Sequence, residues 1–271
     1  MTEFRKCDLL VDGVRVQVIE AGKGKPLIYF HGAGAGGGFD ELLPLAEKHR
    51  LIVPVHPGFG GSDDDLTISS VFDYVVHYAT LFDALKLHEP VDLVGHSLGG
   101  WIASLFTIFQ GHRVHRLVLA CPAGLRVPEH PGVDLFMIAP EDLPSTLAAS
   151  PMVLAKMTQS EVTVDMKVAR YREMTSLARV IWERSCDPKL DRWLKHVSVP
   201  TLILWGEQDK ILPVQQAQCW ADRLGSGAEI AIFNGVGHLV FLESPGAVKR
   251  VASFLKVEAY NRLEDPNEAS E

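Results

Sequence analysis

The fold is decided by the stretch Val91-Asp92-Leu93-Val94-Gly95-His96-Ser97-Leu98-Gly99-Gly100. Residues 91–94 read as a buried strand and residues 98–110 as a helix, so Ser97 stands at the turn between them. The pattern Gly-x-Ser-x-Gly in this context is typical of a sharp turn that presents a serine nucleophile. Such a turn is crowded, and glycine is therefore needed two positions before and two positions after the serine.

Outward from this turn, short apolar runs alternate with segments of helical periodicity. The runs predict strands at 14–19, 26–30, 51–55, 91–94, 116–120, 199–205 and 229–233, and the periodic segments predict helices at 39–49, 71–87, 98–110, 215–224 and 247–260. Short apolar runs are typical of strands buried on both faces. Strands that alternate with helices predict an α/β fold, with a mostly parallel sheet and helices on both faces.

The alternation stops between residues 124 and 196, which we interpret as a helical cap inserted into a core of residues 1–123 and 197–271. Within it, Thr163 to Arg184 carry a stripe at helical spacing, which predicts an amphipathic helix: Val164, Val168, Tyr171, Thr175, Ala178 and Trp182. The five internal methionines also fall in the inserted segment 124–196: Met137, Met152, Met157, Met166 and Met174. They either fill the core of the cap or line an apolar pocket between cap and core that accepts varied acyl groups.

Composition and charge exclude several classes of protein. The 271 residues carry a net charge of −8, which offers no basic surface for nucleic acid. No apolar run approaches the roughly 20 residues of a spanning helix, and the first residues lack the apolar stretch of a signal peptide. The four cysteines form no CxxC pair, so we expect reduced thiols. We therefore expect a cytoplasmic protein that acts on a small molecule, without nucleic acid or membrane as partner; the oligomeric state stays open.

A serine nucleophile needs a base and a third group that orients the base. After the insertion, the strand at 199–205 ends in Gly206-Glu207-Gln208-Asp209, and of the two carboxylates we favour Asp209 over Glu207 as the acid. His238 follows the next predicted strand and is the candidate base. Both sites come after the carboxyl ends of strands, the edge where open α/β sheets place their ligands.

Two backbone N–H groups are expected to form an oxyanion hole: that of Leu98, directly after the nucleophile, and that of Ala33, in the loop after the strand at 26–30. The same loop matches the dinucleotide pattern G-x-G-x-x-G from Gly32 to Gly37. That interpretation also needs an acid about 20 residues further on, and the corresponding strand end, Pro54-Val55-His56, has none. We therefore expect no cofactor. We also expect no metal, because His112 and His115 have no carboxylate or cysteine near them in the sequence.

Together these motifs resemble the α/β-hydrolase superfamily from about Val14 to Leu255: Phe30-His31-Gly32, Pro57-Gly58-Phe59-Gly60-Gly61-Ser62, Gly95-His96-Ser97-Leu98-Gly99-Gly100, Gly206-Glu207-Gln208-Asp209 and Gly237-His238. The resemblance implies that Ser97 is the nucleophile, His238 the base and Asp209 its orienting acid. Two departures stand out. Relatives often carry Asp where this chain has Val55, and the branch that hydrolyses carbon–carbon bonds in ring-fission products typically has Trp where this chain has Leu239.

These features predict a cofactor-free serine hydrolase that cleaves a small, mainly apolar carboxylic ester through an acyl-enzyme. One alternative is a carbon–carbon bond hydrolase of ring-fission products, against which Leu239 argues. In that case a cap arginine such as Arg170, Arg172 or Arg179 would bind the substrate carboxylate. Another alternative is a binding protein of the same fold that has lost turnover. Dehalogenases and epoxide hydrolases need Asp in place of Ser97 and are excluded.

Overall fold

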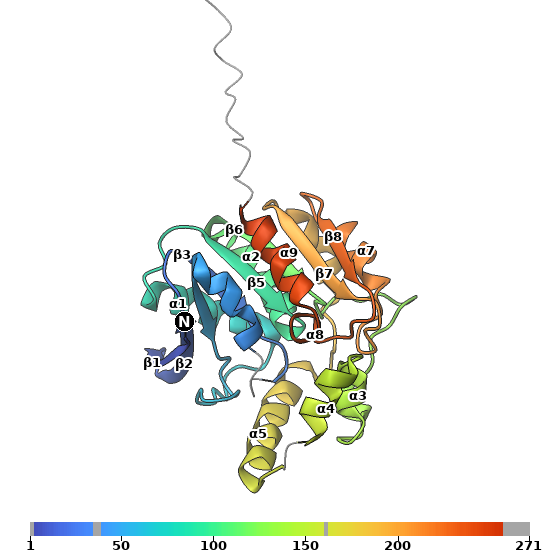
Figure 1. The fold of residues 1–271 in the computed structure, drawn as a ribbon. Coiled ribbons are helices and arrows are strands. Elements are labelled where there is room, and N and C mark those ends of the chain that lie inside the picture. The colour runs from blue at the N-terminus through green and yellow to red at the C-terminus, as the bar shows by residue number, and fades with distance from the viewer. Residues whose placement is uncertain (1–2, 35–38, 160–161, 257–271) are drawn as a thin grey trace, which may run out of the picture.

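The computed structural model describes residues 3–34, 39–159 and 162–256. Its centre is an eight-stranded sheet with the order β1-β2-β4-β3-β5-β6-β7-β8 (Figure 1). The strands are β1 (Arg5–Val11), β2 (Val14–Ala21), β3 (Lys25–Phe30), β4 (His49–Pro54), β5 (Val91–His96), β6 (Val114–Ala120), β7 (Thr201–Gly206) and β8 (Glu229–Phe233). All neighbours pair in parallel except β1 with β2 and β2 with β4. The predicted mostly parallel sheet is confirmed.

Helices cover both faces of the sheet. The helices α1 (Val71–Ala84) and α2 (Leu98–Phe109) pack together on one face, whereas the 3₁₀ helix η1 (Asp40–Glu47) and α9 (Pro245–Lys256) pack together on the other (Figure 1). The short helices α7 (Gln216–Ala221) and α8 (Val240–Glu243) complete the core. The strands β5 and β7 are buried along their whole length, as their apolar runs predict for strands covered on both faces. The predicted last helix extends to residue 260, but residues 257–260 lie outside the described part.

The strand β1 is absent from the sequence-based expectations. Most of its residues are exposed, so it contains neither a buried apolar run nor a clear alternation. Its signal lay in the turn Asp12-Gly13, where both residues have positive φ, at 49° and 84°. An Asp-Gly pair with this geometry is typical of a tight hairpin.

Between β6 and β7 the chain forms the helices that we predicted as a cap. They are η3 (Leu135–Met137), α3 (Leu143–Leu147), α4 (Pro151–Gln159), α5 (Val164–Ile181), α6 (Leu190–Trp193) and η4 (Leu194–His196). Figure 1 shows α3, α4 and α5 beyond one end of the strands of the sheet. No helix in the described ranges has the length and apolar character needed to cross a membrane.

The helix α5 confirms the predicted helix, but the predicted apolar stripe faces solvent and is not buried against another described element. Val164, Val168, Tyr171 and Trp182 are exposed, while the residues that α5 buries are Ser176 and Leu177. Helical spacing reports that apolar residues share a face, but it does not report whether another element covers that face.

Candidate active site

Ser97 lies in a strained turn between β5 and α2. Its φ of 53° and ψ of −116° are rare for a residue with a side chain. A Cβ on Gly95 would lie 2.3 Å from the carbonyl oxygen of Gly99, and a Cβ on Gly99 would lie 2.0 Å from that of Phe30. Both glycines are therefore required by contact, as the motif indicated. Strain of this kind is found where a side chain must be held in a fixed direction.

Asp209 and His238 come together from two loops. Asp209 follows β7, His238 follows β8, and Nδ1 of His238 lies 2.7 Å from Oδ2 of Asp209. Both side chains are buried. Because the carboxylate accepts, the hydrogen of the neutral ring is on Nδ1, and Nε2 keeps a free lone pair. The competing acid Glu207 is exposed and accepts the N–H of Gly235 at 3.0 Å instead.

The carboxylate of Asp209 is held from both sides. Its Oδ1 accepts the backbone N–H groups of Ile211 and Leu212, each at 2.9 Å. Burial alone would raise the pKa of Asp209, but the charge and hydrogen bond of His238, with the two backbone N–H groups, lower it below its ordinary value. The group is therefore ionised at neutral pH and can stabilise an imidazolium on His238.

His96 connects the nucleophile turn to the base. Its Nε2–H donates to the carbonyl oxygen of His238 at 2.9 Å, and the two ring centroids are 5.1 Å apart. Burial lowers the pKa of His96 to about 3, so this ring is neutral. Among the described residues Ser97 makes no direct hydrogen bond to His238. Such a contact is often longer without substrate than in the reacting complex.

The two backbone groups predicted for the oxyanion hole come from the start of α2 and from the loop after β3. Leu98 begins α2, and the first N–H groups of a helix have no partner inside it. A Cβ on Gly32 would lie 3.3 Å from that of Ser97, which places the loop that contains Ala33 against the nucleophile. Residues 35–38 of this loop, including Gly36 and Gly37 of the dinucleotide pattern, lie outside the described ranges.

Two buried histidines hold the Ala33 loop, and the sequence analysis missed both. Nε2 of His31 accepts the backbone N–H of His56 at 3.0 Å, so its Nδ1–H donates to the carbonyl oxygen of Gly32 at 2.7 Å. The Nε2–H of His56 in turn donates to the carbonyl oxygen of His31 at 2.8 Å, and its Nδ1 accepts from the hydroxyl of Tyr78. In a trans peptide the N–H points opposite to the carbonyl. Fixing the carbonyl of Gly32 therefore fixes the direction of the Ala33 N–H.

Glu243 ties the base to the inserted helices, and sequence reasoning missed it too. Its Oε1 accepts the N–H of Gly237 at 3.1 Å, and its Oε2 accepts those of Ala149 and Ser150 at 2.8 and 2.7 Å. The N–H of His238 also donates to the carbonyl oxygen of Leu147 at 2.9 Å. The loop of the base and the chain before α4 are thus joined directly.

One set of possible metal ligands lies at the site. Cys121, Asp209 and His238 place their ligand atoms within 4.8 Å of one another. Burial and the nearby charge of Asp209 raise the pKa of the Cys121 thiol well above its ordinary value, whereas a metal needs the thiolate. Asp209 and His238 are already bonded to each other, so the arrangement fits a hydrogen-bonded catalytic pair better. His115, for which we expected no carboxylate partner, does contact Asp92 at 3.1 Å.

The residues expected to form a substrate pocket are placed differently. Met137, Met152 and Met166 are exposed, so most of the methionines neither fill the cap core nor line a pocket. Of the three candidate arginines, Arg170 and Arg172 are exposed on α5, and Arg179 is paired with Asp64 at 2.6 Å. We therefore assign none of the three to a substrate carboxylate.

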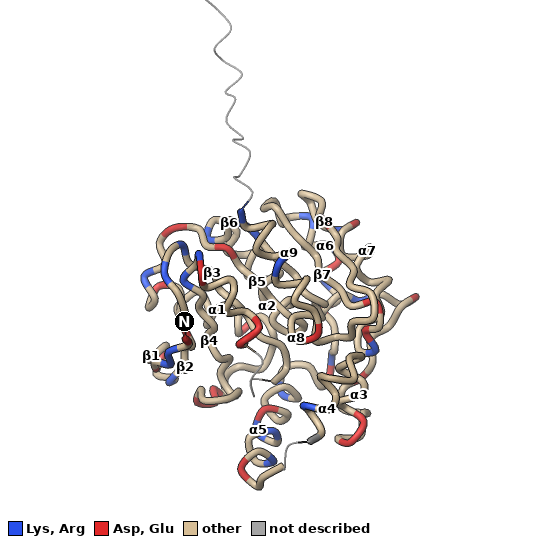
Figure 2. The backbone as a smooth tube through the Cα atoms, viewed as in Figure 1, with Lys and Arg blue, Asp and Glu red and all other residues tan. Residues whose placement is uncertain are grey.

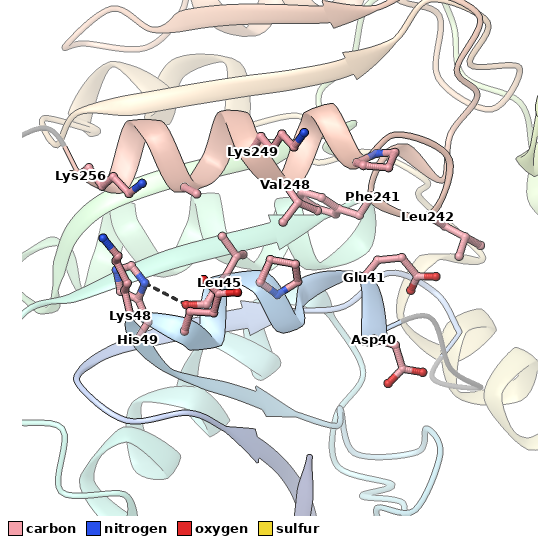
Figure 3. Close-up of a pocket in the computed structure, with 14 residues that line it drawn as sticks. Asp40, Glu41, Leu45, Lys48, His49, Phe241, Leu242, Val248, Lys249 and Lys256 are labelled. Atoms are coloured by element: carbon pink, nitrogen blue, oxygen red, sulfur yellow. Dashed lines mark hydrogen bonds between the residues drawn. The ribbon is translucent and has the colours of Figure 1, made fainter. Parts of the chain in front are cut away.

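Two hollows lie apart from the catalytic residues. One of about 430 Å³ runs between η1 and α9, with Phe241 and Val248 in its apolar floor and Lys249 and Lys256 on α9 (Figure 3). The other, of about 560 Å³, lies beside Trp101 and is lined also by the C-terminal part of α5. Neither is lined by Ser97, Asp209 or His238, so we do not assign the substrate to either.

Comparison with known proteins supplies the reaction class. A sequence model described as "Alpha/beta hydrolase family" matches residues 27–251. The 2-hydroxy-6-oxo-2,4-heptadienoate hydrolase of Pseudomonas putida is 28% identical over 268 residues, which cover 92% of this chain and 96% of that protein. The human monoacylglycerol lipase is 28% identical over 235 residues, covering 78% and 68%.

The structural comparison agrees with the sequence comparison. The crystal structure of a serine hydrolase involved in carbazole degradation superposes with a TM-score of 0.75 at 25% identity, covering 94% of this chain and all (100%) of that one. The similarity therefore extends over the inserted helices as well as the sheet.

Proposed function

The chain belongs to the alpha/beta hydrolase family, and on that basis we propose that it hydrolyses a carbon–carbon bond beside a ketone in a small ring-fission-type acid. The observation that carries the proposal is the buried Asp209–His238 pair beside the Ser97 turn, in a chain similar over nearly its whole length to a hydrolase of this type. The sequence alone favours an ester, because Leu239 stands where the carbon–carbon branch typically has Trp. We give more weight to the similarity over nearly the whole chain than to that single position.

The residues have distinct roles in the proposed reaction. Nε2 of His238 takes the proton of Ser97 as its oxygen attacks the ketone carbon, and Asp209 stabilises the imidazolium that results. The N–H groups of Leu98 and Ala33 receive the negative charge that develops on the ketone oxygen. The carbon–carbon bond then breaks, and the enolate oxygen of the departing group takes the proton from His238. Water activated by the same imidazole releases the acid from Ser97.

For 2-hydroxy-6-oxo-2,4-heptadienoate this sequence adds one water across the bond between C5 and C6. The acyl carbon C6 leaves as acetate, and C5 takes up a proton to give 2-hydroxypenta-2,4-dienoate. Before the bond breaks, the proton of the 2-hydroxyl moves to C5, because C5 of the dienol is an sp2 carbon that cannot release an electron pair into the π system. In the resulting 2,6-dioxo-3-enoate the departing electron pair is delocalised through C3 and C4 onto the oxygen of C2, which makes the carbon leaving group accessible to hydrolysis.

Ester hydrolysis is the second candidate. Leu239 follows the base where the carbon–carbon branch typically has Trp, and the lipase among the relatives acts on an ester. The same triad serves both reactions, because each forms an acyl group on Ser97.

Steady-state kinetics separate the two candidates. We expect kcat/KM for 2-hydroxy-6-oxo-2,4-heptadienoate, followed by loss of its dienol absorbance, to exceed that for p-nitrophenyl acetate by at least a hundredfold. Turnover of the ester with none of the dienoate would establish the ester candidate instead. Labelling by a fluorophosphonate without turnover of either substrate would leave only a binding function.

A further inference from the structure

The helix α5 exposes an apolar stripe that no described element covers. Val164, Val168 and Tyr171 lie on one face at helical spacing, and Trp182 continues that face at the end of the helix. Their exposed fractions are 73%, 53%, 71% and 68%. The helix has 18 residues, which is about 27 Å at 1.5 Å per residue. Large apolar side chains exposed together along such a length mark an interaction surface.

The exposed surface continues from α5 onto η3. The ring of Trp182 packs against that of Phe136 with centroids 5.0 Å apart, and the next residue, Met137, is 81% exposed. We call Val164, Val168, Tyr171, Trp182 and Met137 the cap stripe. Figure 1 shows α5 projecting away from the sheet, so this face is accessible to a large partner.

Basic side chains flank the cap stripe. At about 100° per residue, Lys167 and Arg172 fall on its two sides, and Arg170 lies further round the helix. All three are exposed, and within the described residues none forms a salt bridge. Of the two acids on α5, Glu173 already accepts the N–H of Gly60 at 2.9 Å, and Asp165 is exposed in the first turn on the same flank as Arg172. Figure 2 shows both basic and acidic positions along α5, in a chain whose net charge is −8.

We propose that the cap stripe adsorbs to the surface of an anionic phospholipid membrane. An amphipathic helix that lies in the membrane interface has apolar residues on one face and Lys or Arg beside them, and Trp and Tyr are favoured at that depth. The cap stripe has each of these features. The contact is peripheral and involves no helix that crosses the membrane, and it departs from the expectation, drawn from the sequence, that a membrane is not a partner.

A second copy of the chain fits this surface less well. A parallel pair of α5 helices joined through their stripes brings the flank with Arg172 against the partner's flank with Lys167. An antiparallel pair brings the flank with Lys167 against its own copy, while Arg172 meets the flank that also carries Asp165. Like charges at such positions oppose association, whereas phosphate headgroups attract them.

Vesicle sedimentation of the full chain tests the proposal. We expect binding to vesicles of phosphatidylglycerol and phosphatidylcholine, weaker binding in 0.5 M salt, and at least tenfold weaker binding to phosphatidylcholine alone. Val168→Glu should lower the partition coefficient at least tenfold. Leu10→Glu, at an exposed apolar position on β1, is the matched control and should bind as the wild type does. Lys167→Gln with Arg172→Gln should remove most of the preference for the anionic lipid.

Two further measurements keep the test decisive. Vesicles should shift the tryptophan emission to shorter wavelength, and Trp182→Phe should remove most of the shift, because Trp101, Trp205 and Trp220 are buried and Trp193 is half-buried. Far-UV circular dichroism verifies that each variant is folded. Three results would overturn the proposal: no binding to anionic vesicles, equal losses for Val168→Glu and Leu10→Glu, or a dimer in light scattering that Val168→Glu dissociates.

Discussion

Asp209→Asn removes a charge while preserving side-chain size, and its effect follows from the bonds around the carboxylate. Oδ1 accepts the N–H groups of Ile211 and Leu212, and Oδ2 accepts from His238. Asparagine can satisfy both backbone donors only with its carbonyl oxygen, which directs its NH₂ group at Nδ1 of His238. The imidazole must then accept at Nδ1 and carry its hydrogen on Nε2. In that tautomer it cannot take the proton of Ser97.

We expect this variant to lose on the order of 10⁴-fold in kcat with little change in KM, which corresponds to about 5 kcal/mol of transition-state stabilisation. The assay is steady-state hydrolysis at pH 7.5, with circular dichroism to verify folding. Glu207→Gln is the matched control, because Glu207 is exposed and does not bond to His238; its kcat should stay within about threefold. An Asp209→Asn enzyme with a tenth of the wild-type activity, or a larger loss in Glu207→Gln, would refute the assignment of the acid.

Three further predictions concern the nucleophile, the carboxylate of Glu243 and two buried histidines. Ser97→Ala should lose on the order of 10⁴-fold or more in kcat with an unchanged fold, and activity within tenfold of wild type would remove Ser97 from the role of nucleophile. Glu243→Ala leaves three backbone N–H groups without their acceptor and should lower the free energy of unfolding, measured by urea titration, by at least about 2 kcal/mol. Glu243→Gln keeps one acceptor oxygen and should lower the free energy of unfolding by less. The reverse order of the two variants would contradict the structure. Burial lowers the pKa of His31 and of His77 to about 4, so as pH falls from about 6.5 to 4 the unfolded chain takes up protons that the folded chain does not. The free energy of unfolding should therefore fall by about 1.4 kcal/mol per pH unit for each of these histidines as the pH is lowered. His77→Gln should reduce this slope by about 1.4 kcal/mol per pH unit. A free energy of unfolding that does not change between pH 5 and 6.5 would contradict the prediction.

The parts of the fold and site that could be predicted are those whose signal is local. The strand β5 is an apolar run buried on both faces, and Gly95 is required by its close contact with Gly99 in the same turn. The sequence favours Asp209 over Glu207 but shows no contact that separates the two carboxylates, and the structure bonds Asp209 to His238.

What the sequence could not supply depends on contacts between distant segments. His31 and His56 are 25 residues apart, and Glu243 meets Ser150 from 93 residues away. His56 and Glu243 belong to none of the quoted motifs, and the motif Phe30-His31-Gly32 does not indicate what its histidine contacts. The burial of the apolar stripe on α5 was predicted wrongly for a related reason. Helical periodicity defines which residues share a face, but not which element lies against that face. The edge strand β1 was missed because an exposed strand has little apolar pattern to detect.

The most direct test of the central claim is identification of the products formed from 2-hydroxy-6-oxo-2,4-heptadienoate by mass spectrometry, with wild type and Ser97→Ala in parallel. We predict equal amounts of acetate and 2-hydroxypenta-2,4-dienoate from the wild type, and neither above background from the variant. Intact substrate after prolonged incubation with the wild-type enzyme, or the same products from Ser97→Ala at a comparable rate, would contradict a serine-dependent carbon–carbon bond hydrolase.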